Sequence, residues 1–271
     1  MTVTTPASPS VPSMLSDRVF GVVARAAALP DVRTEVEANH DDNRWWPRHV
    51  TDPRLRMLVA GWSSRVSYAM VDTYARVVAD ANALGFDALA GLPDRELTDL
   101  VRPIGLPAAR IRYLRSLVEF LDRLAAEGTD PRAAEPDLLI NRFATEVHQA
   151  SFKVAQCAVL YARGYHCGVI PVDSGMVTRL APVLGLALPS GPVAHERMRT
   201  ILEDCVRDRP DDYRRLADQH AVNIPGSAAP TWWAHLVLIY FKRRYLNRPG
   251  PRLCPTRPVC HQVVDCPHVQ G

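Results

Sequence analysis

The sequence is poor in lysine: of its 32 basic residues only Lys153 and Lys242 are lysines, and the rest are arginines. It also has no long hydrophobic run, because the longest uncharged apolar stretch, Trp232 to Phe241, is too short to span a bilayer. A basic start followed by an apolar block is missing at the N-terminus, which argues against a secretory signal. These absences predict a cytoplasmic protein without a membrane partner.

The composition is that of an ordinary globular protein, with 47% hydrophobic and 23% charged residues among 271. A chain of this length buries a large core without disulfides. The net charge of +3 says little about nucleic acid. Arginine suits bidentate contacts with phosphate, but a GC-rich genome explains the excess equally well. Residues 1–14, rich in Thr, Ser and Pro, predict a disordered tail.

Apolar residues recur every three or four positions along most of the chain, and an alternating strand pattern is almost absent. Clusters of Pro and Gly interrupt this pattern at short intervals, which is typical of packed neighbouring helices. The sequence contains no repeat of 20 to 50 residues, which argues against a solenoid. The sequence therefore predicts an all-α protein, with apolar stripes over 54–84, 111–124, 153–163, 174–184, 194–206 and 231–246.

Lys153 and Asp173 are the first candidate catalytic pair. A helix from Lys153 to Arg163 rises roughly 15 Å, and the nine residues 164–172 reach back up to about 30 Å when extended. Asp173 can therefore return beside Lys153, which places an amine and a carboxylate in one cleft, as imine chemistry at a sugar carbon requires. The alternatives are a surface charge for Lys153 and a helix N-cap for Asp173.

The C-terminal segment contains a second candidate site. Three of the six cysteines fall within 13 residues there, close to two histidines. Without a secretory signal, such a cluster more often binds metal than forms disulfides. A tetrahedral Zn²⁺ site, an iron–sulfur cluster and free thiols in a loose tail remain open. The candidate ligands are Cys254, Cys260, Cys266 and His261, with His268 or Asp265 as substitutes for His261.

The densest basic stretch is Lys242-Arg243-Arg244. Such a stretch suits contacts with DNA phosphates. It is equally typical of a solvated helix end, where cations complement the helix dipole.

Taken in order, these segments resemble the helix-hairpin-helix DNA glycosylase superfamily, in particular its endonuclease III branch. The resemblance runs from about Leu55 to Cys266. It rests on Ile104-Gly105-Leu106 before a helix, Lys153-Val154-Ala155 at the imine-forming lysine, Val172-Asp173-Ser174 at the essential aspartate, Arg179-Leu180 through Leu184-Gly185-Leu186, and Pro258-Val259-Cys260 with Cys266 at the iron–sulfur loop.

The resemblance implies a monomeric enzyme that binds double-stranded DNA and excises a flipped base, with Lys153 and Asp173 as catalytic residues and possible lyase action through a lysine imine. It implies two lobes, 51–163 in the centre and 15–50 with 164–271 around it, and a 4Fe–4S cluster or Zn²⁺ in the loop 254–266. The implied DNA contacts are Arg65, Gln149, Ser151, Lys242, Arg243 and Arg244.

Several positions depart from the family pattern. Gln149 and Ser151 stand where the hairpin carries glycines, so we expect hindered approach to phosphate and loss of positive φ angles. Arg65 replaces the glutamine that enters the duplex, and Gly175 replaces a histidine after the aspartate. One cysteine of the cluster, the third, is missing. Two rival functions therefore remain: a small-molecule or nucleoside-processing enzyme on the same fold, and a non-catalytic nucleic-acid or protein-binding module.

Overall fold

The computed structural model describes residues 13–45, 49–247 and 262–264, and the regular elements in these ranges are helical. The all-α fold class is confirmed. α1 begins at Ser13, so Ser13 and Met14 belong to a helix and not to a disordered tail, whereas residues 1–12 lie outside the described residues. No helix in the described part of the chain combines the length and the apolar character needed to cross a membrane.

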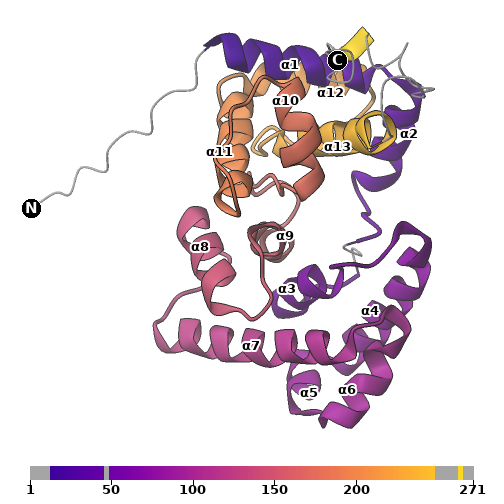
Figure 1. Cartoon of the computed structure of the whole chain (residues 1–271), viewed down its shortest axis with the longest axis vertical. Coiled ribbons are helices and arrows are strands. Elements are labelled where there is room, and N and C mark those ends of the chain that lie inside the picture. The colour runs from indigo at the N-terminus through magenta and orange to yellow at the C-terminus, as the bar shows by residue number, and fades with distance from the viewer. Residues whose placement is uncertain (1–12, 46–48, 248–261, 265–271) are drawn as a thin grey trace, which may run out of the picture.

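The helices form two lobes, one above the other in Figure 1, with α2 and α3 in different lobes and the chain crossing back after α9. The lower lobe consists of α3 (Pro53–Trp62), α4 (Val71–Leu84), α5 (Phe86–Gly91), α6 (Asp94–Val101), α7 (Pro107–Ala126), α8 (Pro136–Glu146) and α9 (Phe152–Arg163). The upper lobe consists of α1 (Ser13–Ala27), α2 (Pro30–Asn39), α10 (Ala181–Val183), α11 (Val193–Arg207), α12 (Pro210–Gln219) and α13 (Thr231–Phe241).

Side-chain caps and prolines fix where several helices of the lower lobe begin. The carboxylate of Asp52 accepts a hydrogen bond from Arg54 N (2.8 Å) at the start of α3, and Pro53 occupies the first helical position. Glu135 does the same for α8, where Pro136 follows it. The hydroxyl of Ser151 caps α9 by accepting from Val154 N. The Ser151 cap thus fixes the end of the hairpin between α8 and α9, where α9 begins.

The apolar stripe over 54–84 is not one helix, because α3 ends at Trp62 and α4 begins only at Val71. The turn between them contains Arg65, whose φ of 59° lies in the left-handed region. The buried guanidinium of Arg110 stabilises this turn by donating to the main-chain carbonyls of Trp62, Ser64, Ile104 and Gly105. The Ile104–Arg110 motif thus buttresses the turn that presents Arg65.

The core of the upper lobe is α13, which is buried around its whole circumference and packs against α1 and α2. Two π-helical turns, η3 (Met176–Leu180) and η4 (Lys242–Leu246), contact each other beside it. They are joined by a hydrogen bond from Arg179 Nη1 to Leu246 O (3.1 Å). Because π-helical turns occur frequently at functional sites, this pair is the first structural sign of one.

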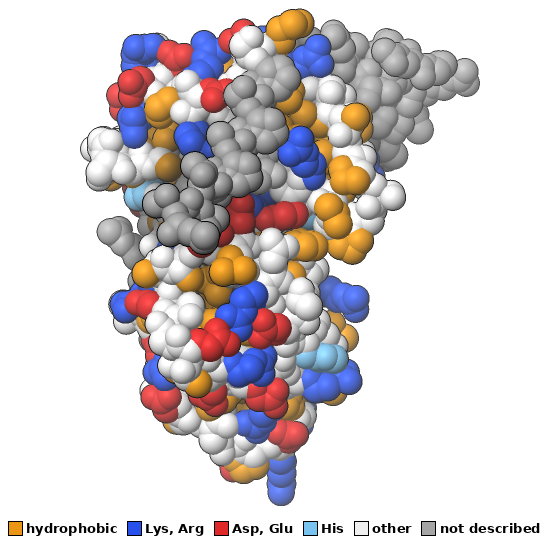
Figure 2. Space-filling model, turned by 90° about the vertical axis from the view of Figure 1, so that its left-hand side faces the viewer, with side chains coloured by type: hydrophobic (Ala, Val, Ile, Leu, Met, Phe, Trp, Pro, Cys, Tyr) orange, Lys and Arg blue, Asp and Glu red, His pale blue; other side chains and the backbone are white. Residues whose placement is uncertain are grey.

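Surface arginines are interspersed with acidic residues on the face shown in Figure 2, and no broad basic patch covers it. Many of them form ion pairs: Arg142 contacts both Glu127 (2.6 Å) and Glu146 (2.8 Å). Exposed pairs of this kind contribute little to stability. On this face, arginines therefore alternate with acidic residues and form no broad basic surface.

Candidate active site

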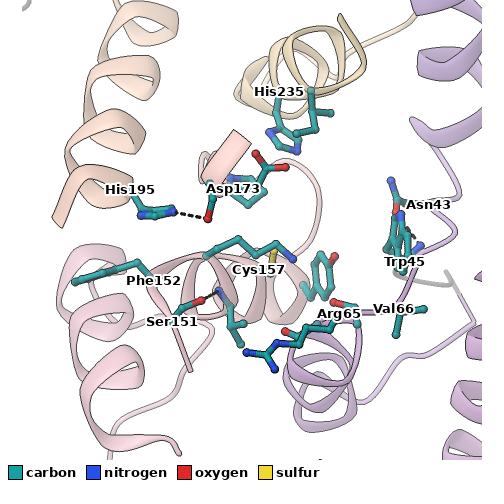
Figure 3. A pocket seen from close by; sticks show the side chains of 18 of the residues that line it. Asn43, Trp45, Arg65, Val66, Ser151, Phe152, Cys157, Asp173, His195 and His235 are labelled. Carbon is teal, nitrogen blue, oxygen red and sulfur yellow. Dashed lines mark hydrogen bonds between the residues drawn. The ribbon is translucent and has the colours of Figure 1, made fainter. Parts of the chain in front are cut away.

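A cleft of about 740 Å³ lies between the two lobes. Its lining comes from the end of α3, the hairpin and first turns of α9, the segment at residues 171–174, α11 and α13. Asp173 and His235 approach it from one side, and Arg65 and Ser151 from the other (Figure 3). The volume falls in the range of small-molecule binding sites.

Lys153 and Asp173 both line this cleft. Lys153 stands in the first turn of α9, and Asp173 follows the segment that returns to the upper lobe. His235 lines the same cleft. Within the described residues, no hydrogen bond or ion pair engages the Lys153 ammonium group. The segment 164–172 therefore returns Asp173 to the cleft that Lys153 lines, as its length allowed. The Lys153 amine is available to a ligand there.

The two carboxylate oxygens of Asp173 have different partners. Oδ1 accepts a hydrogen bond from Met176 N (2.7 Å), which is the helix-capping contact, and Oδ2 accepts from Lys242 Nζ (2.6 Å). Burial acts to raise the pKa of Asp173, but the charge and hydrogen bonds of these partners outweigh it and leave the pKa lowered. Asp173 is thus an oriented, ionised carboxylate at the cleft wall, and also a cap.

Lys242, Arg243 and Arg244 do not form one basic surface. This corrects the expectation, drawn from the sequence, of a single basic stretch suited to DNA phosphates. Lys242 is only 3% exposed and is turned inward to Asp173. Arg243 lines the cleft and lies over the Tyr240 ring, 5.4 Å from its centroid. Arg244 is exposed and pairs with Asp31 (2.9 Å). Of the three, Arg243 alone faces the cleft.

The hairpin keeps a glycine-like backbone at one of its two substituted positions. Gln149 has a φ of 62°, so the expected loss of the positive φ angle is wrong there. Ser151 has a φ of −86° and needs no glycine. Both residues are exposed and line the cleft, and Arg65 lines it from the end of α3. Compared with a glycine at this position, Gln149 therefore changes the size of the side chain at the hairpin tip and not the backbone conformation.

An aromatic stack that sequence reasoning missed forms part of the cleft wall. The rings of Tyr165 and Trp232 are nearly parallel, with centroids 4.8 Å apart. The ring of His235 also stacks on Trp232, with centroids 5.5 Å apart. Trp232 Nε1 donates to His40 O (3.0 Å), which fixes the indole. Trp232 and His235 lie inside the apolar helix α13 and Tyr165 lies just after α9, so no spacing in the sequence separates these cleft residues from ordinary core.

His235 is a neutral group in this wall. It is 7% exposed, its Nδ1 has no hydrogen-bond partner within the described residues, and burial lowers its pKa to about 3. A buried, unpaired ring nitrogen costs free energy until a ligand satisfies it. The ring is therefore an uncharged part of the cleft wall that also holds Lys153 and Asp173.

The lowered pKa of His235 predicts an acid-sensitive stability. The unfolded chain takes up a proton on this ring near pH 6.5 and the folded chain only near pH 3, so stability falls as the pH falls through this window. Between pH 7.5 and 5 we expect wild type to lose on the order of 2 kcal/mol more than His235→Gln. Urea unfolding at both pH values measures the difference. Equal losses would contradict the burial argument, and exposed His148→Gln should behave as wild type.

A buried polar network holds the segment that leads to Asp173. Gln156 of α9 accepts from Val172 N (2.8 Å) and donates to Glu196 of α11 (2.9 Å). Glu203 accepts from Ile170 N (2.8 Å). Arg199, 1% exposed, contacts Glu196, Glu203 and Asp137 of α8. The network thus fixes both the returning segment and the two lobes that form the cleft.

The predicted metal ligands Cys254, Cys260, Cys266 and His261 lie outside the described residues. Within residues 13–45, 49–247 and 262–264, no group of three or more metal-binding side chains is present. Burial raises the pKa of Cys167 to about 11 and that of Cys205 to about 12, so these thiols are structural. The metal site stays a prediction from the sequence.

The sequence matches no family model and no curated protein. Among solved structures it is similar to the crystal structure of the H. pylori 3-methyladenine DNA glycosylase MagIII bound to 1,N6-ethenoadenine, with a TM-score of 0.56 and 14% sequence identity. The match covers 83% of this chain and 97% of that chain. At such low identity the likeness concerns architecture alone: the chain shares the all-α fold of that structure.

Proposed function

We propose that the protein is a DNA base-excision glycosylase that cleaves the N-glycosidic bond of a nucleotide flipped into the cleft. The observation that carries the proposal is the placement of Lys153 and Asp173 on one cleft between two lobes, with the hairpin residues Gln149 and Ser151 at its rim. The fold shared with a DNA glycosylase supports it. A base must leave the stacked duplex to reach such a cleft.

In the proposed reaction the Lys153 ammonium group gives up a proton to solvent, and its Nζ then donates its electron pair to the sugar C1′. The bond from C1′ to the base breaks, its electron pair leaves with the base, and the base takes up a proton from solvent. Positive charge develops on the sugar, and the ionised carboxylate of Asp173 stabilises it. Because the pKa of Asp173 is lowered, this electrostatic role suits it better than accepting a proton.

We further propose lyase activity of the kind found in the endonuclease III branch. Loss of a proton from the Lys153 nitrogen with opening of the sugar ring gives an imine at C1′. The imine allows a proton at C2′ to be lost to solvent, a double bond then forms between C2′ and C3′, and the C3′–O bond breaks with its electron pair leaving on the 3′ phosphate, which cleaves the strand. The unpaired Lys153 ammonium group is the feature in favour of this step within the described part of the chain.

The test is an activity assay on duplexes that each carry one damaged or mismatched base, with base release and strand cleavage measured separately. We expect release from at least one lesion, and about 10²-fold slower release by Asp173→Asn, in the range lost with one electrostatic group. Duplex binding that weakens with salt but releases no base would favour a binding module. Cleavage of free nucleosides without duplex binding would favour the small-molecule enzyme.

Gln149 gives a sharper test of DNA contact through the hairpin. With its φ of 62°, Gln149→Gly keeps the backbone and removes the side chain that blocks a phosphate. We expect duplex affinity to rise about five- to tenfold, the value of one hydrogen bond to a charged group less its costs. Stability should change by less than about 1 kcal/mol, because relieved strain offsets the flexibility of glycine. Fluorescence anisotropy measures the affinity.

The matched control is Gln149→Ala, which retains Cβ and loses the amide. It should bind duplex as wild type does. If the alanine and glycine variants bind the duplex equally well, the side chain at position 149 does not limit the approach of the hairpin backbone to DNA. The proposed contact between this backbone and a phosphate is then refuted.

We also propose that Cys254, Cys260, Cys266 and His261 hold an iron–sulfur cluster or Zn²⁺. The chemistry of the donor set, three thiolates and an imidazole, fits either. Metal analysis of the purified protein distinguishes them, since a cluster contributes iron, sulfide and visible absorption. Changing all three cysteines to serine should remove the metal, whereas serine at the buried Cys157 should not. Full metal content in the triple variant would refute the site.

A further inference from the structure

Lys242, the second of the two lysines, is enclosed behind Asp173. Its Nζ lies 2.6 Å from Asp173 Oδ2, and 3% of the side chain is exposed. The space it occupies exists because residue 175 is glycine: a Cβ there would lie 2.8 Å from Lys242 Nζ and 3.2 Å from its Cδ. Gly175 has a φ of −70°, so its backbone does not require glycine. What the glycine supplies is room for the ammonium group.

We propose that Gly175 and Lys242 act as one positioning device, which holds Asp173 ionised and aims its carboxylate into the cleft. Lys242 is a positioning residue in this arrangement, because it acts through Asp173 and does not line the cleft. The device accounts for the departure at position 175, where any side chain would compete with the lysine. Its effect on catalysis rests on the proposed glycosylase function, whereas its effect on Asp173 does not.

Other charged groups around Asp173 do not replace this contact. Arg243 of η4 acts on Asp173 through its charge, and Arg179 of η3 acts on Lys242. Lys153 of α9 and the neutral His235 of α13 line the same cleft. His195 of α11 contacts Ser174, not the aspartate (3.4 Å). Among the described side chains, Lys242 is the one that donates a hydrogen bond to the carboxylate.

The experiment measures the ionisation of Asp173 directly, by ¹³C NMR of its carboxyl carbon against pH, with Asp173→Asn to assign the signal. Lys242→Met should raise the Asp173 pKa by about one to three units, since an opposite charge at this distance lowers it by that much. Gly175→Ala keeps both charges and should shift the pKa in the same direction by displacing Nζ. Gly91→Ala, where a Cβ meets no atom within 4 Å, should change nothing.

An unchanged Asp173 pKa in Lys242→Met would overturn the proposal. If that variant does not fold, an unchanged pKa in Gly175→Ala overturns it instead. In base-release assays, the acid limb of the pH profile should move to higher pH by the same amount, because a raised pKa protonates Asp173 earlier as the pH falls. A shifted NMR pKa without any base release would leave the device intact and refute only the glycosylase function.

Discussion

Replacing Lys153 with alanine is expected to abolish the covalent adduct that borohydride traps on abasic DNA, and to slow any base release by on the order of 10³-fold or more. The reason is that the other lysine, Lys242, is buried and paired with Asp173, so it is not free to attack the sugar carbon. Mass spectrometry of the digested adduct checks this, since only two lysine side chains can carry the label.

Lys153→Arg is the matched control for charge. It retains a cation in the first turn of α9, where wild type has its ammonium group, but cannot form the imine. It should bind DNA with nearly wild-type affinity and give no adduct. A wild-type amount of adduct in either variant would remove Lys153 as the nucleophile, and label found on Lys242 would mean that its ion pair with Asp173 opens in the complex.

The sequence was sufficient for the parts of this site that depend on chain length and helical period. A helix of known rise followed by nine residues allowed Asp173 to return beside Lys153, and both line one cleft. The helical stripes gave the all-α class because 3.6-residue periodicity is a local property. The break at residues 63–67 escaped because this turn contains neither Pro nor Gly, the residues by which the other breaks were recognised.

The partners of these residues could not be predicted, because they come from distant parts of the chain. Lys242 reaches Asp173 across 69 positions, and its neighbours in sequence are arginines that face elsewhere. Trp232 and His235 lie in a helix that is buried on all sides, so no amphipathic pattern marks the face toward the cleft. The sequence showed that Gly175 departs from the family pattern. The reason for the glycine could not be predicted, because it depends on the Lys242 side chain that fills the space beside it.

The largest expected effect on stability belongs to Arg199→Leu. The substitution leaves Glu203, which is 6% exposed, and Glu196 without their common cation. Burial already raises the pKa of Glu203 to about 7 although Arg199 acts to lower it, so the carboxylate will protonate when the arginine is gone. Breaking a buried ion pair on one side costs about 3–5 kcal/mol. We expect urea unfolding to show this loss in the free energy of unfolding. A loss of that size is a large part of the stability of most domains.

Arg197→Leu on the exposed face of α11 is the matched control and should change stability by less than about 0.5 kcal/mol. Adding Glu203→Gln to Arg199→Leu should recover part of the loss, because the amide still accepts the hydrogen bond from Ile170 N without carrying a charge. Strictly additive losses in this double variant would contradict the coupling. Since the same network holds Val172 through Gln156, Arg199→Leu should also slow base release at temperatures where it is fully folded, which a purely peripheral ion pair would not do.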